Sequence, residues 1–359
     1  MTKPRTVLWD DHQARKARMI DFHGWQMPLS YAATQVEHGA VRQAWGVFDL
    51  CHMGRLRVQG PGASAFLETR VSRKLSDMAD MQVRYGLVLA PDGTVVDDCL
   101  VTREGLDEAA QSWHVVVNAA NLETLRRAWQ DAGEGVLVSD LSAEQAMIAV
   151  QGPQAAVALA DVGLDGRHLR IYSACDLGDL RLSRTGYSGE DGFECFLPTA
   201  QAPALWRRLI AAGAQPCGLG VRDILRLEAG MPLYGQELDR HHTPIEAGLD
   251  FAVARDKPFI GCEVCARQRQ DGPPRRLVGL RGEGRRLART GYPVLHDDQQ
   301  IGVITSGTMS PSCGAVIAMA YVETAHAAVD TPVAVDIRGA PEPFRIVSLP
   351  FYRRSRTGS

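Results

Sequence analysis

The sequence predicts an α+β protein of several domains that ends in an all-β domain. A chain of 359 residues is long enough for two or three separate hydrophobic cores. Strand-like and helix-like stretches alternate irregularly before residues 271–274 (Asp-Gly-Pro-Pro), which form the best linker in the chain. After this linker come short strands separated by Gly, Pro and Ser, a pattern typical of a small β-barrel-like domain.

The N-terminal part is expected to begin with helices. Residues 11–21 are charged and amphipathic, residues 22–28 interrupt the pattern, and residues 35–45 resume it. Residues 56–58 predict a strand that runs through Gln-Gly-Pro into a helix at 63–69. The same arrangement returns with a strand at 147–150, Gln-Gly-Pro at 151–153 and a helix at 155–160. The similarity between these two strand–turn–helix units reflects either an old duplication or chance.

The remaining elements are predicted from β-branched and aromatic runs and from helical periodicity. Residues 56–140 are expected to form one compact α+β unit, because three strand candidates and a helix follow one another there. The expected elements after residue 80 are strands at 83–89, 94–101 and 113–117, helices at 122–131, 205–212 and 221–229, and strands at 277–280, 300–304, 315–322, 333–337 and 344–347.

Composition excludes several classes of function. The net charge of −3 and the isoelectric point near 6.4 give no basic field for nucleic acid or an acidic membrane. The N-terminus lacks the apolar core of a signal peptide, and no apolar run reaches the length of a membrane helix. Eight scattered cysteines are typical of reduced thiols in a cytoplasmic protein. Cys262 and Cys265 form a single CxxC, too little for a zinc site, so we expect no metal.

Residues 184–194 (Arg-Thr-Gly-Tyr-Ser-Gly-Glu-Asp-Gly-Phe-Glu) are the most constrained stretch of the chain. Their three glycines allow backbone angles that other residues avoid, so we expect a tight turn before a strand. Such a turn would present Tyr187, Glu190, Asp191 and Glu194 to a ligand. The stretch therefore predicts a binding turn, although it does not name the ligand.

Asp97 and Asp98 lie within an apolar strand pattern, residues 95–101 (Val-Val-Asp-Asp-Cys-Leu-Val). Because side chains alternate along a strand, one aspartate faces each side, and at least one faces a buried or cleft surface. A carboxylate in such a place has a raised proton affinity, which suits acid–base chemistry. The alternative is a strand end where both carboxylates are in water.

Glu194 and Arg222 are the best candidates for binding a ligand. Glu194 lies in the strand after the turn, where a carboxylate can accept two N–H bonds from the edge of a heterocycle. Arg222 lies near a helix start after Gly218 and Gly220, and its guanidinium can bind a ligand carboxylate. The alternatives are a solvated strand glutamate and a salt bridge between Arg222 and its neighbour Asp223.

Taken together and in order, these segments resemble the T-protein (aminomethyltransferase) family of the glycine cleavage system. The resemblance extends over residues 8–354, nearly the whole chain. It rests on residues 19–28, 48–54, 96–98, 117–121, 149–153, 184–194, 218–235, 305–311 and 350–354.

The resemblance implies a cloverleaf of three domains around a central folate site. The implied domains are a discontinuous α+β domain of residues 1–55 and 141–268, a second α+β domain of residues 56–140, and a C-terminal β-barrel domain of residues 275–359. The implied reaction moves the methylene carbon of an aminomethyl group from the lipoyl arm of H-protein to tetrahydrofolate. Its products are methylene-tetrahydrofolate, ammonia and the dihydrolipoyl carrier.

The resemblance also assigns roles to individual residues. Asp98 would be the acidic residue near the reacting folate nitrogens, Glu194 would hold the amino-pterin edge, and Arg222 would belong to the folate-binding set. Further pocket positions are Met53, Tyr85, Asn118, Tyr187, Phe251 and Tyr352. Separately, the basic cluster of Arg285, Arg286 and Arg289 is expected either to dock an acidic carrier protein or to be a solvated loop.

Some positions depart from the usual pattern of the family. Cys51 stands where Ser is common, Phe251 where Trp is frequent, Ala254 where Lys is common, and Gly93-Thr94 where two glycines are usual. Phe251 can still stack on a ring. Two other functions therefore stay open: a related tetrahydrofolate-dependent demethylase of a small methylated amine or sulfonium compound, and a non-catalytic folate-binding protein.

Overall fold

A computed structural model gives the fold and describes residues 3–107 and 111–355. The chain divides into two compact units. The first comprises residues 1–69, 73–86 and 99–223, and the second comprises residues 70–72, 87–98 and 224–359.

A six-stranded sheet forms the centre of the first unit. All of its neighbouring strands pair antiparallel except β13 and β3, which are parallel. The strand order is β10-β11-β12-β9-β3-β13. The strands are β3 (Gly46–Asp49), β9 (Gln145–Gln151), β10 (Ala174–Leu177), β11 (Leu180–Ser183), β12 (Gly192–Pro198) and β13 (Gln215–Cys217).

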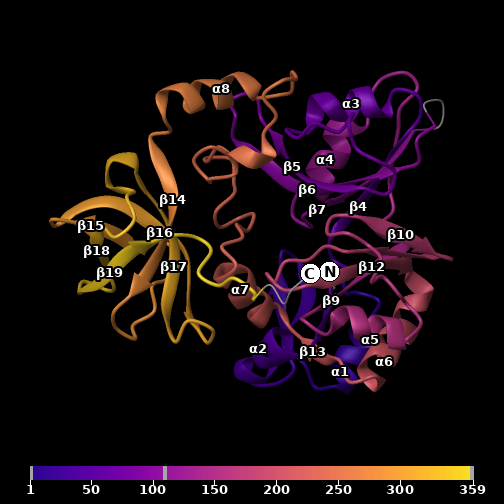
Figure 1. Cartoon of the computed structure of the whole chain (residues 1–359), viewed down its shortest axis with the longest axis horizontal. Helices are drawn as coiled ribbons and strands as arrows, with labels where there is room; N and C mark the ends of the chain where they lie inside the picture. The colour runs from indigo at the N-terminus through magenta and orange to yellow at the C-terminus, as the bar shows by residue number, and fades with distance from the viewer. Residues whose placement is uncertain (1–2, 108–110, 356–359) are drawn as a thin grey trace. The chain divides into compact units, whose positions relative to one another are not determined.

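Helices cover this sheet and close its hydrophobic core. Helices α5 (Ala155–Asp161) and α6 (Ala202–Ala211) lie beside β9 and β12 (Figure 1). Helix α2 (Thr34–Gln43) packs against β3 and β13. The core between these layers is apolar; Ile148, Phe193, Leu197, Trp206 and Leu209 are at most 2% exposed. Burial of such side chains is the main force that holds the helices on the sheet.

The expectation of a helix over residues 11–21 was wrong for its second half. Helix α1 (Trp9–Ala14) ends early, because Lys16 has a φ of 53° that no helix continues. A hairpin of β1 (Arg18–Phe22) and β2 (Trp25–Ser30) follows. His23 and Gly24 both have positive φ, which fits the two-residue turns that join hairpin strands.

The two strand–turn–helix units are confirmed. Strand β4 (Gly54–Gln59) leads into α3 (Ala63–Arg70) just as β9 leads into α5. In both turns the glycine of Gln-Gly-Pro has a positive φ, 113° at Gly60 and 136° at Gly152. The same residue types therefore produce the same local backbone in both places.

A five-stranded sheet has the order β5-β6-β7-β4-β8. Its strands were largely predicted from their β-branched residues, and β8 is the one that the pattern did not predict. Helix α4 (Leu122–Trp129) lies against this sheet at β8. The strands besides β4 are β5 (Val83–Leu89), β6 (Val95–Glu104), β7 (Ser112–Val117) and β8 (Leu137–Asp140).

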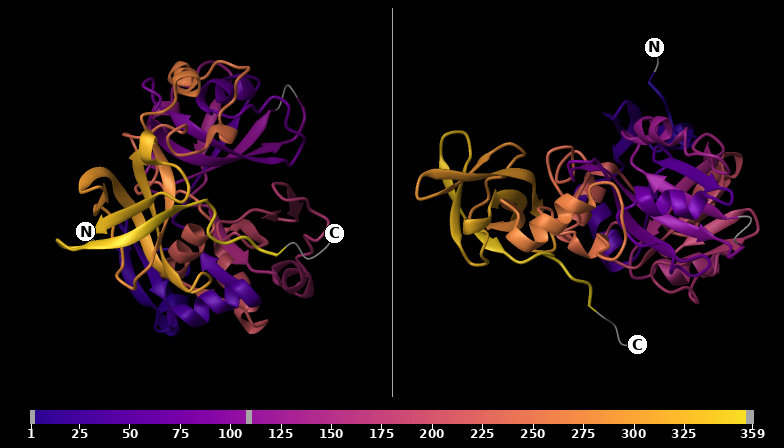
Figure 2. Two further views of the ribbon diagram at one scale, coloured as in Figure 1. Left: turned by 60° about the vertical axis from the view of Figure 1, so that its left-hand side comes forward. Right: turned by 90° about the horizontal axis from the view of Figure 1, so that it is seen from above.

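The second unit contains a closed barrel, as the sequence predicted. Its order is β14-β17-β16-β15-β18-β19, and β19 pairs with β14 to close it. Figure 2 shows these orange-to-yellow strands from two further directions. Alternate residues such as Leu280, Ala318, Ala320 and Ile346 fill the interior. The strands are β14 (Arg275–Gly282), β15 (Pro293–His296), β16 (Gln299–Ser310), β17 (Ala315–Glu323), β18 (Pro332–Asp336) and β19 (Pro341–Val347).

Several shorter elements complete the two units. The linker 271–274 lies between α8 (Cys262–Asp271) and β14, as expected. Helix α7 (Leu219–Glu228) begins in the first unit and ends in the second. The 3₁₀ helices are η1 (Thr199–Gln201), η2 (Asp250–Ala252) and η3 (Thr324–His326). The division into three domains remains a prediction. Within residues 3–107 and 111–355, no helix has the length and apolar character needed to cross a membrane.

Candidate functional site

The glycine turn of residues 184–194 is built around the side chain of Gln151. A Cβ at Gly186 would come within 2.1 Å of this side chain, and one at Gly192 within 2.3 Å. Only Gly189 of the three has a positive φ, at 80°. Two of the glycines are thus required by close approach rather than by backbone angle. The turn is also bonded to Gln151, which accepts a hydrogen bond from the Ser188 hydroxyl at 2.8 Å.

We expected the turn to present four side chains to a ligand, but two of them are instead bonded to arginines of the protein. Glu190 accepts a hydrogen bond from Arg42 at 2.8 Å, and both side chains are buried. Asp191 pairs with Arg184 through two bonds, of 3.0 and 2.6 Å. The prediction of Glu190 and Asp191 as ligand-facing groups is therefore wrong for this structure, because each already neutralises an arginine that holds the turn.

Glu194 is a buried carboxylate with few partners. It lies in β12, opposite Ser183 of β11 and Ala149 of β9, and is 4% exposed. Within the described residues its one hydrogen-bond donor is the Thr185 hydroxyl, at 2.5 Å from Oε2. Burial raises the pKa of Glu194, and the Thr185 bond and the charge of Arg222 only partly oppose that rise. An ionised carboxylate can accept about four hydrogen bonds, so most of its capacity is unused.

Arg222 and Tyr187 lie together near Glu194. Arg222 is half-buried in the first turns of α7, and its guanidinium carbon is 4.8 Å from the centre of the Tyr187 ring. This is the distance of a cation–π contact. Burial lowers the pKa of Arg222, while Tyr187 and Glu194 act in the opposite direction. The sequence-predicted residues Glu194, Arg222 and Tyr187 are thus brought into one cluster.

Residues 49–55 run from the end of β3 into β4 and are held by several hydrogen bonds. Asp49 accepts a hydrogen bond from the backbone N–H of Cys51 at 2.9 Å. Arg55 donates to the carbonyl oxygens of Cys51 and Met53, and also to that of Ser142 at 2.6 Å. The loop carries the predicted site residue Met53, which is half-buried.

The other two predicted residues of the first unit lie in, or directly after, strands of the five-stranded sheet. Tyr85 is a half-buried residue of β5. Asn118 directly follows β7, where its carbonyl accepts bonds from the N–H groups of Asn121 and Leu122 at the start of α4. The structure gives both a fixed backbone, and their roles in a site stay predictions.

The second unit holds Asp98, Phe251 and Tyr352. Asp97 is fully buried, whereas Asp98 on the other face of β6 is half-buried, so the expected division between the two faces is confirmed. Phe251 in η2 is 65% exposed, unusual for a large aromatic. Tyr352 is half-buried, and its N–H donates to the Glu228 carbonyl at 2.7 Å.

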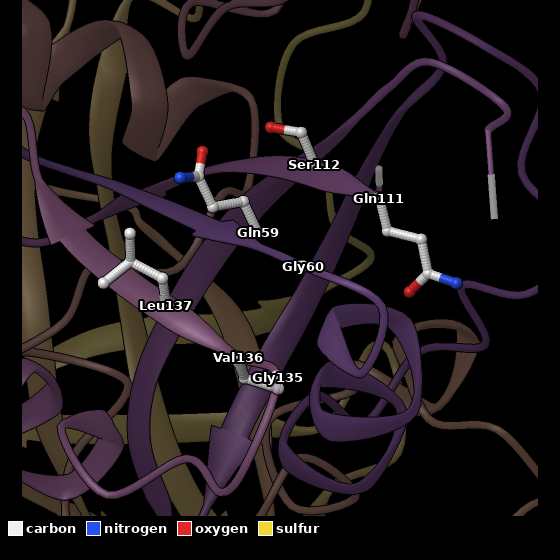
Figure 3. Close-up of a pocket in the computed structure, with 7 residues that line it drawn as sticks. All are labelled: Gln59, Gly60, Gln111, Ser112, Gly135, Val136 and Leu137. Carbon is white, nitrogen blue, oxygen red and sulfur yellow. The ribbon is translucent and has the colours of Figure 1, made fainter. Parts of the chain in front are cut away.

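A pocket of about 490 Å³ lies elsewhere in the first unit, at the ends of β4 and β7 and the segment before β8 (Figure 3). Its lining includes no titratable side chain and none of the predicted site residues. It therefore offers nothing for acid–base chemistry. Its lining residues are Gln59, Gly60, Gln111, Ser112, Gly135, Val136 and Leu137. The described ranges contain no group of three or more His, Cys, Asp or Glu side chains arranged for a metal ion.

The sequence analysis did not identify the residues outside the glycine turn that hold it in place. Gln151 and Arg42 contact the glycine turn from outside it, and Arg42 lies 148 residues away from its partner Glu190. Only Gln151 carried a signal, since it opens the second Gln-Gly-Pro. The ring of His52, in the segment after β3, is also buried.

Comparison with known proteins identifies the family of the chain. Residues 8–257 match the GCVT N-terminal domain, and residues 275–353 match the glycine cleavage T-protein C-terminal barrel domain. A protein of Rubrobacter xylanophilus named aminomethyltransferase is 45% identical over 366 residues, covering 99% of this chain and 96% of the relative. One from Streptomyces avermitilis with the same name is 45% identical over 374 residues, covering 98% and 99%.

A solved structure agrees as well. The crystal structure of glycine cleavage system aminomethyltransferase T from Bartonella henselae matches with a TM-score of 0.91 and 34% identity, over 97% of this chain and 98% of that one. The fold and the site thus define an α+β protein of the GCVT class with a C-terminal β-barrel. The chain belongs to the glycine cleavage T-protein family, which confirms the resemblance seen in the sequence.

Proposed function

We propose that this protein is an aminomethyltransferase that passes the methylene carbon of an aminomethyl group to tetrahydrofolate and releases ammonia. The name carried by its relatives supports this reaction. The observation that supports the folate site in this chain is the buried Glu194 carboxylate with one hydroxyl donor. The 2-amino group and the adjacent ring N–H of a pterin supply two parallel donors that would fill its free acceptor positions.

Arg222 is the second part of this proposal. Its guanidinium lies over the Tyr187 ring. The positive charge of this group attracts an anionic or electron-rich part of a ligand. Because Arg222 lies in the same cluster as Glu194, its N–H donors suit an acceptor atom of the pterin ring, such as the ring carbonyl beside the N–H that Glu194 would bind. Tyr85, Asn118, Met53, Phe251 and Tyr352 complete the proposed set of binding residues.

Asp98 is the proposed acid–base residue. Its half-buried position on β6 keeps it reachable, in contrast to Asp97. Release of ammonia requires a proton on the leaving amine, and attack by a folate nitrogen requires loss of one. A carboxylate close to the reacting nitrogens can hold that proton or stabilise the iminium charge that develops on the methylene carbon.

The donor in this proposal is the lipoyl arm of an H-protein carrier, and the compartment is the cytoplasm. A carrier-bound donor agrees with the Bartonella henselae structure, which is described as part of the glycine cleavage system. The test is ammonia release from aminomethyl-lipoyl H-protein, with and without tetrahydrofolate. We expect release to be much faster with tetrahydrofolate, because the methylene carbon lacks its acceptor without it.

The same assay separates the two other candidate functions. A demethylase would consume tetrahydrofolate with a methylated amine such as dimethylglycine and would ignore aminomethyl-lipoyl H-protein. A non-catalytic binding protein would bind tetrahydrofolate and turn over neither donor. Either result contradicts the proposed reaction while leaving the folate site intact.

A further inference from the structure

We propose that Glu37 is a positioning residue of the folate site, because its buried carboxylate fixes the start of α7 and thereby the place of the Arg222 guanidinium. This inference rests on the proposed function and adds to it a residue that acts through Arg222 rather than on the ligand. Glu37 lies in α2 and is 1% exposed. In the part of the chain that the structure describes, its carboxylate is bonded only to backbone N–H groups.

The Glu37 carboxylate joins segments that are far apart in the sequence. Its Oε1 accepts hydrogen bonds from the N–H groups of Tyr31 at 2.6 Å and Ala32 at 2.8 Å, directly after β2. Its Oε2 accepts one from the N–H of Gly218 at 2.9 Å, between β13 and α7. Hydrogen bonds to a charged acceptor are stronger than those between neutral groups. The carboxylate therefore ties the end of the β1–β2 hairpin to the chain just before α7.

Gly218 occupies the N-cap position of α7. The helix begins at Leu219, and the Gly218 carbonyl accepts the first bond of the helix from the N–H of Arg222, at 3.2 Å. No side chain fits at Gly218, since a Cβ there would come within 2.2 Å of the Leu29 carbonyl oxygen. Glu37 instead accepts the N–H of this N-cap residue, as the glutamate of a capping box does, from 181 positions away. Its negative charge also suits the positive end of the helix dipole.

The place of the Arg222 side chain depends on this helix start. Arg222 is the fourth residue of α7, so a shift of the first turn moves its guanidinium directly. The guanidinium carbon lies 4.8 Å from the centre of the Tyr187 ring, in the cluster that we propose for the pterin. A misplacement of about 1 Å can cost on the order of a hundredfold in function. A residue that fixes the helix start is therefore expected to act on ligand binding.

Asp11 offers a matched control in the same unit. It is a buried carboxylate of α1, 8% exposed, and it accepts two hydrogen bonds from Arg207 of α6, at 2.8 and 3.1 Å. Like Glu37, it ties one segment of the unit to a helix. Neither α1 nor α6 carries a proposed site residue. Loss of either carboxylate should therefore lower thermal stability, whereas only loss of Glu37 should weaken ligand binding.

The test is a double-mutant cycle of Glu37→Gln and Arg222→Ala in the full chain, with calorimetry of tetrahydrofolate binding and melting temperature as readouts. In Glu37→Gln an amide nitrogen replaces one acceptor oxygen and faces an N–H group. The dissociation constant should rise about tenfold and the melting temperature should fall. On the Arg222→Ala background, Glu37→Gln should change the dissociation constant by less than about twofold, because the group that it positions is gone. Asp11→Asn should lower the melting temperature with the affinity unchanged.

An equal rise in the dissociation constant on both backgrounds would overturn the proposal, as would a lower melting temperature of Glu37→Gln with unchanged affinity. Should Glu37→Gln not fold, amide hydrogen exchange of the wild type gives the answer. Tetrahydrofolate should slow exchange at Gly218 together with Tyr31 and Ala32, because one carboxylate binds all three N–H groups. Exchange that stays unchanged at any of the three would contradict the proposal. Failure of the folate site itself is distinguishable, because then the wild type would not bind tetrahydrofolate at all.

Discussion

Two buried glutamates, one in each unit, show how the same side chain can be structural in one place and available to a ligand in another. Glu237 of the second unit is fully buried and accepts four hydrogen bonds. Its donors are Nη1 of Arg226 at 2.7 Å, the N–H of Leu233 at 3.0 Å, and the hydroxyls of Thr305 and Ser306, both at 2.6 Å. Its acceptor capacity is filled.

Glu194 of the first unit is almost as buried but has one donor among the described residues, the Thr185 hydroxyl. A protein tolerates a buried carboxylate only when hydrogen bonds replace the lost water. Glu237 meets that condition within the fold. Glu194 does not, so its partners are expected to come from a ligand. The number of donors, rather than burial itself, separates the two roles.

The largest expected effect is on turnover. It concerns the aspartate pair of β6, in which Asp97 is buried and Asp98 is within reach of a ligand. Asp98→Asn should lower turnover roughly a hundred- to ten-thousand-fold, because acid–base groups contribute that much. Tetrahydrofolate affinity and the circular dichroism spectrum should stay close to those of the wild type. Steady-state ammonia release measures the first and calorimetry the second. Turnover near the wild-type value would remove Asp98 from the mechanism.

The next effect concerns stability and tests the structural half of the comparison. Glu237→Leu should lower the free energy of unfolding by about 3–5 kcal/mol, since it leaves the Arg226 charge buried without its partner. Replacing both residues, as Arg226→Met with Glu237→Leu, should recover most of that loss. Urea denaturation of the single and double variants measures both quantities. A single variant as stable as the wild type would mean that Glu237 is not structural.

Glu194→Gln should have the opposite effect on stability. Because burial raises the Glu194 pKa above its value in the unfolded chain, the folded state binds this proton more tightly. The wild type therefore loses stability as pH rises from the unfolded pKa through the folded one. The glutamine variant lacks this loss, so it should be more stable at pH 7.5, on the order of 1 kcal/mol, as seen when functional sites are neutralised.

The stability difference of Glu194→Gln should shrink toward zero as the pH falls to 4.5, the ordinary pKa of a glutamate side chain. Thermal melts between pH 4.5 and 8 check this dependence, with Glu237→Gln as the matched control. A glutamine variant that is less stable than the wild type at every pH would show that Glu194 has a structural role like that of Glu237.

The smallest effect concerns the predicted docking of the carrier. Arg286 is already paired with Glu342 at 2.7 Å, whereas Arg285 and Arg289 are exposed. Arg285→Ala with Arg289→Ala should raise the Michaelis constant for H-protein severalfold, most at low salt, because rim charges act mainly on association. Tetrahydrofolate affinity should not change. Carrier kinetics with the wild-type salt dependence would place docking elsewhere.

Much of the fold could be predicted because local patterns and tertiary packing agree. The strands at 83–89 and 113–117 and the helices after each Gln-Gly-Pro lie where their periodicity placed them. Residues 18–22 failed because pairing with residues 25–30 overrides a charged, helix-like pattern. The signal that would have corrected it was His23-Gly24, whose positive φ values suit a hairpin turn. Short strands such as β13 depend on a parallel partner that the sequence does not reveal.

The site was predicted in part for a related reason. Glu194, Arg222 and Tyr187 were found because glycines mark the turn and the helix start that hold them. The different fates of Glu190 and Glu194 could not be foreseen, since they depend on whether Arg42 or Thr185 reaches each carboxylate. The number of hydrogen-bond donors around a carboxylate is a property of the folded chain, because distant segments supply them.

The most direct test of the central claim is calorimetry of tetrahydrofolate binding to the wild type and to Glu194→Ala at neutral pH. Loss of a charged acceptor should cost about 1.5–3 kcal/mol for each hydrogen bond, which is roughly ten- to a hundredfold in dissociation constant. Thermal stability of the variant should be no lower than that of the wild type. Equal affinity in the two proteins would contradict the claim that the unfilled carboxylate of Glu194 binds the folate.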